Sequence, residues 1–86
     1  MRIRVNDMIN AYILTVMQPG YTEKAIKEMR KLENVEKISV VAGEYDIVIR
    51  VRVKSLGDLL KVTDKIQLIE GVKKTTTQVI EKELTL

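Results

Sequence analysis

The chain of 86 residues contains no cysteine and no histidine. Without cysteine there is no disulfide and no thiolate metal site. Without histidine the chain lacks the commonest general base, the commonest zinc ligand and the usual switch near neutral pH. These absences argue against a cofactor-free hydrolase and leave only a carboxylate or lysine enzyme open. We therefore expect no enzyme, no metal and no cofactor.

Aromatic residues and long apolar runs are also scarce. There is no Phe or Trp and there are three Tyr, so the chain has few platforms on which bases could stack. The 15 basic and 12 acidic residues are interspersed, without a basic block. No apolar run is long enough to cross a bilayer, and no apolar segment of signal-peptide type follows the N-terminus. We expect a cytoplasmic protein with no membrane contact and no direct DNA binding.

The apolar pattern that is present predicts one domain, residues 1–86, with the order strand, helix, strand, strand, helix, strand. Ser55 is the expected N-cap of the second helix and Gly71 its expected end. Right-handed crossovers would place both helices on one face of an antiparallel sheet with strand order 4-1-3-2, which is the ferredoxin-like βαββαβ fold of the α+β class. The expected strands are 11–17, 35–42, 45–53 and part of 72–83; the helices are 23–33 and the segment between Ser55 and Gly71, the latter with a stripe of Leu56, Leu59, Leu60, Thr63, Ile66 and Ile69.

The predicted sheet is apolar on both faces. Along residues 11–17 both alternating sets are apolar except at Thr15, and Val48 adds to the face that no helix covers. Two helices bury only one face, so the other is expected to pack against a second copy. The simpler alternative is partial screening of that face by arginine stems. We assign the dimer surface to Ile13, Thr15, Met17, Val41, Val48 and Arg50.

Two segments are candidates for binding a ligand. Gly43, Glu44, Tyr45 and Asp46 lie between the second and third strands. Asp46 is unusual in a strand and its carboxylate could hold an ammonium group, while free N–H groups of the turn could hold a carboxylate; together these would recognise an α-amino acid. The simpler interpretation is a hairpin turn stabilised by Asp46. Thr75, Thr77 and Gln78 supply hydroxyls and an amide on the last strand, where threonine is also a common strand residue.

These residues together resemble the Lrp/AsnC family. The resemblance is carried by the segment from Ala11 to Gly20, by the Gly-Glu-Tyr-Asp turn at 43–46, by Glu70-Gly71-Val72 and by 75–77, and it covers residues 11 to about 82. It implies the C-terminal effector-binding domain of that family, the RAM domain. Such domains dimerise through their sheets as a dimeric α/β barrel, form rings that are commonly octameric, and bind amino acids in clefts between dimers. The implied effector site is Gly43, Glu44, Tyr45, Asp46, Thr75, Thr77 and Gln78.

Full-length family members also carry a helix-turn-helix domain, whereas only about ten residues precede the first predicted strand here. The sequence therefore resembles a stand-alone version that could join full-length Lrp/AsnC regulators. Two further interpretations remain open: an oligomerisation partner without a ligand, and a dimeric ferredoxin-like enzyme. An RNA-recognition module of the same topology would need aromatic residues on the open face of the third strand, where Asp46, Val48, Arg50 and Arg52 stand instead.

Overall fold

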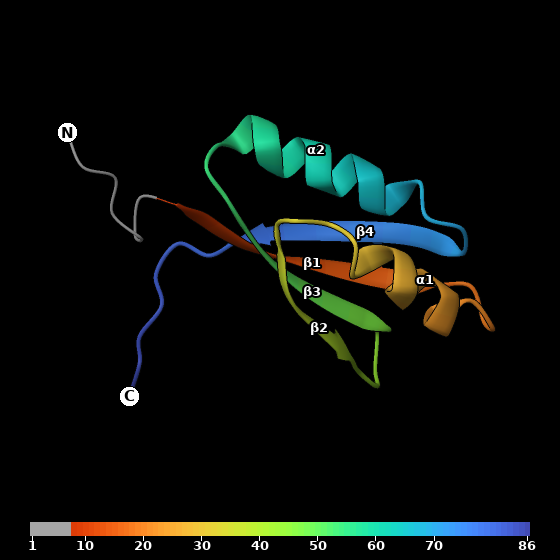
Figure 1. The fold of residues 1–86 in the computed structure, drawn as a ribbon. Coiled ribbons are helices and arrows are strands. Elements are labelled where there is room, and N and C mark those ends of the chain that lie inside the picture. Colours follow the sequence, from red (N-terminus) through yellow and green to blue (C-terminus); the bar gives the residue numbers. More distant parts are fainter. Residues whose placement is uncertain (1–7) are drawn as a thin grey trace.

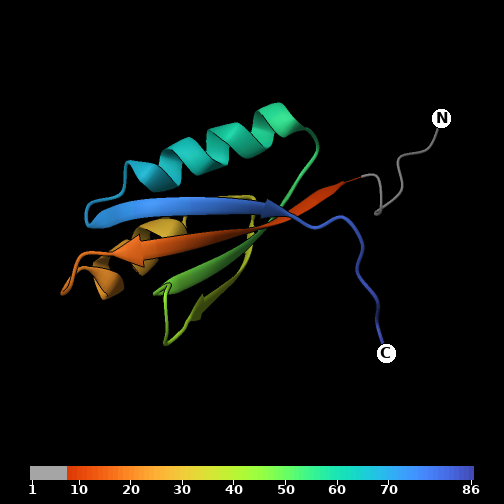
Figure 2. The same ribbon diagram turned by 180° about the vertical axis from the view of Figure 1, so that it is seen from behind.

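The computed structural model describes residues 8–86 and confirms the ferredoxin-like fold. Its strands form one antiparallel sheet in the order β2-β3-β1-β4, as the sequence predicts. Both helices pack on the same face of that sheet (Figure 1, Figure 2). The elements in chain order are β1 (Ile9–Met17), α1 (Thr22–Met29), β2 (Val35–Val40), β3 (Ile47–Val53), α2 (Leu56–Gln67) and β4 (Val72–Val79).

The core lies between the sheet and the two helices. In β1 and β3 every second residue is buried, because alternate side chains of a strand point to opposite faces. Opposite them, both helices contribute small or aliphatic side chains at helical spacing. The buried hydrophobic residues are Ala11, Ile13, Met17, Ala25, Met29, Ile47, Ile49, Val51, Val53, Leu59, Val62 and Ile66.

This arrangement corrects half of the predicted dimer surface. Ile13, Thr15 and Met17 lie beneath the helices and are at most 5% exposed, so a partner sheet could not reach them. The face away from the helices, which we call the open face, instead carries the alternate residues of β1 together with Val48 and Arg50 of β3. The antiparallel register places Leu14 opposite Val48 and Tyr12 opposite Arg50. Val41 is exposed beyond the end of β2.

The helices differ from prediction at their ends and in their buried stripes. Helix α1 stops at Met29 because the next residues close tighter turns, in which the Lys31 N–H donates to Glu28 O and the Leu32 N–H to Met29 O. Helix α2 begins as predicted, with the Ser55 hydroxyl accepting from the Asp58 N–H at 3.1 Å. Its buried stripe is Leu59, Val62 and Ile66, whereas Leu56 and Leu60 are 62% and 64% exposed.

Gly71 does not end α2, which stops at Gln67, but lies in the turn that leads into β4. Its φ is 91°, and a Cβ there would stand 2.2 Å from the Cβ of Tyr21. Both the backbone conformation and the lack of space therefore require glycine. In residues 8–86, neither helix has the length and apolar character needed to cross a membrane.

Candidate functional site

The turn between β2 and β3 contains four of the seven candidate effector residues, 43–46. Gly43 has a φ of 141°, with open space where a Cβ would be, so its conformation rather than crowding calls for glycine. Gly43 and Glu44 are exposed, while Tyr45 and Asp46 are half-buried. The turn therefore presents backbone groups and one free carboxylate to its surroundings.

Asp46 fastens this turn to the end of β1. Its Oδ2 accepts from the Met17 N–H at 2.7 Å. Its own N–H donates to Thr15 O at 2.9 Å, and its carbonyl oxygen accepts from the Val41 N–H at 2.9 Å. These bonds favour the simpler interpretation, in which Asp46 stabilises the turn, and they leave the second carboxylate oxygen, Oδ1, as the group that could face a ligand.

The candidate residues of β4 fall on two faces of the sheet. Thr75 pairs with Thr15 and Thr77 with Ile13, which places both on the helix side. Gln78 pairs with Tyr12 and so belongs to the open face. The Thr75 hydroxyl accepts from Gln67 Nε2 at 2.9 Å, while Thr77 and Gln78 are exposed. The predicted set is therefore not one cluster within a single chain.

Thr15 connects the turn and β4 at the same end of the sheet. Its carbonyl oxygen accepts from the Asp46 N–H, and Thr15 itself pairs with Thr75 of the neighbouring strand β4. Since β1 lies between Asp46 and β4, roughly 10 Å separate the two at normal strand spacing. A single chain thus brings the two segments to one end without enclosing a ligand between them. The Thr15 hydroxyl itself is fully buried and finds no hydrogen-bond partner among residues 8–86.

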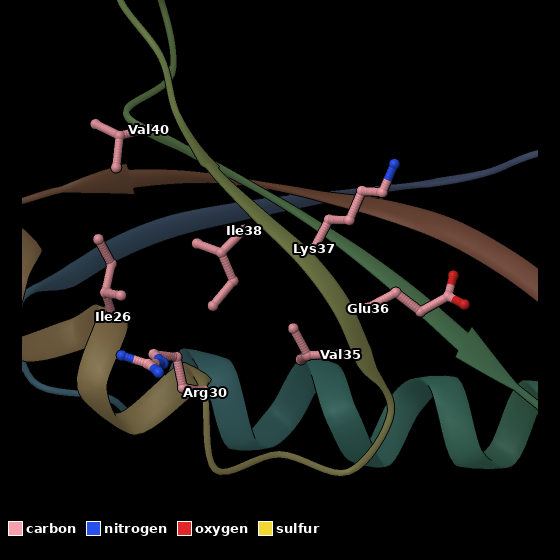
Figure 3. Close-up of a pocket in the computed structure, with 7 residues that line it drawn as sticks. All are labelled: Ile26, Arg30, Val35, Glu36, Lys37, Ile38 and Val40. Carbon is pink, nitrogen blue, oxygen red and sulfur yellow. The ribbon is translucent and has the colours of Figure 1, made fainter.

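A separate groove of about 390 Å³ runs between α1 and the edge strand β2 (Figure 3). Ile26 of α1 and Val35 and Ile38 of β2 face this space, whereas Glu36 and Lys37 point away from it. Arg30 and Val40 complete the lining. Four of its seven lining residues are aliphatic and three are charged, and it holds none of the predicted effector residues.

The open face carries a charged network centred on Arg50. Arg50 Nη1 and Nη2 donate to the two carboxylate oxygens of Glu83, each at 2.8 Å. The same guanidinium donates to Tyr12 Oη at 3.1 Å and stands 5.5 Å from the centroid of that ring. Glu36 bridges Arg50 and Arg52, with both N–O distances 3.4 Å.

This network shifts the ionisation of its members. The hydrogen bonds from Arg50 hold the pKa of the Glu83 carboxyl below its ordinary value. The hydrogen bond to Glu83 raises the pKa of Arg50 further above its usual range. The pair is therefore charged at any pH near neutrality.

Sequence reasoning found Arg50 but missed its partner. Glu83 lies beyond the last strand, where no periodicity predicts a contact with a strand on the far side of β1. Hollows of about 540 and 270 Å³ flank the pair, the first bounded by Asn10, Arg52 and Ile80 and the second by Tyr12, Ser39 and Val48. Across residues 8–86, no group of three metal-binding side chains comes together.

The described residues form a small α+β domain of ferredoxin-like topology, with a glycine-containing turn at one end of its sheet. The chain belongs to the Lrp/AsnC family, because the profile described as "Lrp/AsnC ligand binding domain" matches residues 10–85. This confirms the family that the sequence motifs indicate.

The comparisons with individual proteins agree with this assignment. An uncharacterized HTH-type transcriptional regulator of Pyrococcus horikoshii is 30% identical over 73 residues, which are 84% of this chain and 46% of the regulator. The chain thus spans about half the length of that curated relative. The crystal structure of FFRP-DM1 is 29% identical with a TM-score of 0.78, and the match covers 84% of this chain and 97% of the other.

An enzyme also contains a related segment. A homocitrate synthase of Sulfolobus acidocaldarius is 30% identical over 64 residues, which are 74% of this chain but 14% of the synthase. The similarity therefore concerns a small part of that enzyme.

Proposed function

We propose that this domain is an amino-acid-responsive regulatory and assembly module of the Lrp/AsnC type, without catalytic activity and without DNA contacts of its own. The observation that carries the proposal is the match of the family's ligand-binding domain to residues 10–85. The relation to an HTH-type regulator supports a role in transcription regulation. The cytoplasm, where such a regulator would meet its effectors, is the location that goes with this proposal.

The effector would occupy a cleft that a neighbouring dimer completes. The exposed backbone at Gly43, the Glu44 carboxylate and the Thr77 hydroxyl are free to meet a ligand, and Asp46 Oδ1 can accept from its ammonium group. One chain leaves these groups on separate strands of an open surface, and most small-molecule sites are concave and bury the ligand. A second chain would supply the missing wall.

Self-association would begin at the open face. The apolar side chains of this face are only half-buried, because the helices pack on the other face of the sheet. They are Tyr12, Leu14, Val16 and Val48. A two-fold partner would cover the same patch on each copy. Dimers would then assemble into a ring, and full-length Lrp/AsnC regulators are candidate partners in mixed assemblies.

Isothermal titration against the twenty amino acids at millimolar concentration tests the sensing function. We expect heat from at least one of them, and a weaker response in Thr77→Val. Thr63→Val is a matched control, because Thr63 lies on α2, where its hydroxyl donates to Leu59 O of the same helix. No heat from any amino acid would exclude amino-acid sensing and leave the assembly function standing.

One observation favours a second function, in which the domain is only an oligomerisation partner. Asp46 Oδ2 and the Thr75 hydroxyl, which would otherwise point to a ligand, are engaged within the chain. In that case Asp46→Ala would alter stability but no binding activity. The same titration separates the two functions.

A further inference from the structure

Residues 80–86, which we call the tail, leave β4 near the start of β1 and run beyond that end of the sheet (Figure 1, Figure 2). The Ile80 N–H donates to Asn10 O at 2.8 Å, so the tail begins alongside β1 (Figure 2). Glu83 then contacts Arg50 on β3. This contact links the tail to β3, which β1 separates from β4.

The Glu83 carboxylate is what holds the tail in place. Residues 81–86 are all exposed, and among the described residues their side chains make no hydrogen bond other than the pair with Arg50. Leu84 is 70% exposed and Leu86 is fully exposed. The hollow of about 540 Å³ beside Asn10 and Arg52 shows that the tail does not pack closely on its own sheet. Moving the tail elsewhere would therefore forfeit one bidentate ion pair and little packing.

The tail and the open face are complementary in charge and in polarity. The tail presents Glu81 and Glu83, while the face presents Arg50 and Arg52. The tail also has two exposed leucines, and the face has half-buried apolar side chains on β1 and β3. A second copy of the chain carries the same open face and the same tail, so the tail of each copy could contact the open face of the other.

We propose that in the dimer the tails are exchanged, so that Glu83 of each chain pairs with Arg50 of the other copy. Exchange keeps both ion pairs and allows the tail leucines to be buried between the two chains, and a two-fold axis makes the contact reciprocal. Swapping an identical element between copies adds area to an interface without requiring a new contact type. This inference rests on the self-association proposed above and assigns the residues that fasten it.

Charge-reversal variants distinguish exchanged tails from tails that stay on their own chain. Arg50→Glu and Glu83→Arg each bring like charges together, and each alone should raise the dimer dissociation constant about ten-fold or more. An equimolar mixture of the two variants should restore tight dimers, because exchange then pairs the unmodified Arg50 with the unmodified Glu83, and the two introduced charges with each other, across the interface. Native mass spectrometry identifies the mixed species, and sedimentation equilibrium gives its dissociation constant. Asp64→Arg is a matched control, since it reverses the charge of an exposed carboxylate on α2, away from the tail and the open face, and should leave dimerisation unchanged.

Other outcomes overturn the exchange. If a single chain carrying both Arg50→Glu and Glu83→Arg dimerises normally while the mixture stays as weak as either variant, the contact is made within one chain. If Glu83→Arg dimerises like the unmodified chain, the tail does not fasten the dimer; this exposed position keeps the test valid even if Arg50→Glu folds poorly. Both results leave the proposed self-association and the amino-acid titration untouched. A chain that remains monomeric at all concentrations overturns the exchange and the proposed assembly together.

Discussion

Asp46 allows the structural and the ligand-binding interpretations to be separated by experiment. Its Oδ2 accepts from the Met17 N–H at 2.7 Å, a length typical of hydrogen bonds to ionised groups. Met17 is 5% exposed, so water has little access to that N–H if the carboxylate is removed. An unsatisfied buried N–H costs about 1–3 kcal/mol, and we expect Asp46→Ala to lower the free energy of unfolding by about 2 kcal/mol.

The substitution leaves the rest of the turn able to form. The bonds to Thr15 and Val41 use the backbone of residue 46 and do not depend on its side chain. Asp46→Asn retains an acceptor for the Met17 N–H but loses the charge, and it should cost about half as much. For a domain of this size 2 kcal/mol corresponds to a fall in Tm of about 10 °C.

Urea denaturation followed by circular dichroism, at one fixed protein concentration because dimerisation contributes to stability, measures these differences. Asp64→Ala removes an exposed carboxylate from α2 and serves as the control, with an expected change within about 0.5 kcal/mol. If Asp46→Ala were as stable as the unmodified chain, the fastening role would be refuted. If it were stable and also lost all heat with amino acids, Asp46 would act on the ligand alone.

The remaining unusual groups lead to three further predictions. Gly71→Ala should destabilise the fold by about 3 kcal/mol or more in the same denaturation assay, since the added Cβ would overlap Tyr21. Gly20 has a similar φ of 90° but open space around it, so Gly20→Ala should cost only about 1–2 kcal/mol. Equal losses of stability in the two variants would refute the steric argument. Thr15→Val removes a buried hydroxyl that has no partner in the described part of the chain and should leave stability unchanged or raise it by up to about 1 kcal/mol; a clear loss would reveal a hydrogen bond to that hydroxyl. Because the pKa of Glu83 is lowered by its guanidinium partner, the contribution of this pair to the stability of the folded chain should be fully present above the ordinary carboxyl pKa of about 4.3 and be lost as pH falls through the lowered value; the same denaturation assay repeated across the acid range measures this, and Glu83→Gln should lack the Glu83-dependent part of the change.

The topology was predictable because its signals are local. β3 alternates strictly between buried aliphatic residues and the set containing Val48 and Arg50, and Ser55 caps α2 as its position indicates. Given these elements, handedness fixes the strand order. The sequence motifs likewise indicated the family that the comparisons show.

The predictions failed where contacts between elements distant in sequence determine which side chains are buried. Both sets of alternate residues in β1 are apolar, so periodicity could not tell which set the helices bury; only the register of Leu14 opposite Val48 does so. The crowding of Gly71 against Tyr21 joins two turns that are distant in sequence. The sequence predicts the candidate effector residues as two segments. That Gln78 and Thr77 lie on opposite faces of the sheet follows only from the pairing of β4 with β1.

Sensing should depend on assembly, because the candidate effector residues are divided between separate strands. Within one chain Asp46 and Thr75 are held by internal hydrogen bonds, whereas Glu44 and Thr77 are exposed in the turn and on β4. A ligand that needs groups from two chains binds only the assembled form, so by linkage it must also promote assembly.

The apparent affinity for the amino acid should therefore rise with protein concentration through the range in which the domain associates. At concentrations ten-fold below the dimer dissociation constant, we expect binding to weaken by about ten-fold or more, because the competent state is then a minor species. Sedimentation velocity with and without ligand should show the matching shift toward larger assemblies. An affinity that stays constant from the monomeric to the associated range would mean that one chain holds the complete site, and the location of the ligand between chains would have to be abandoned.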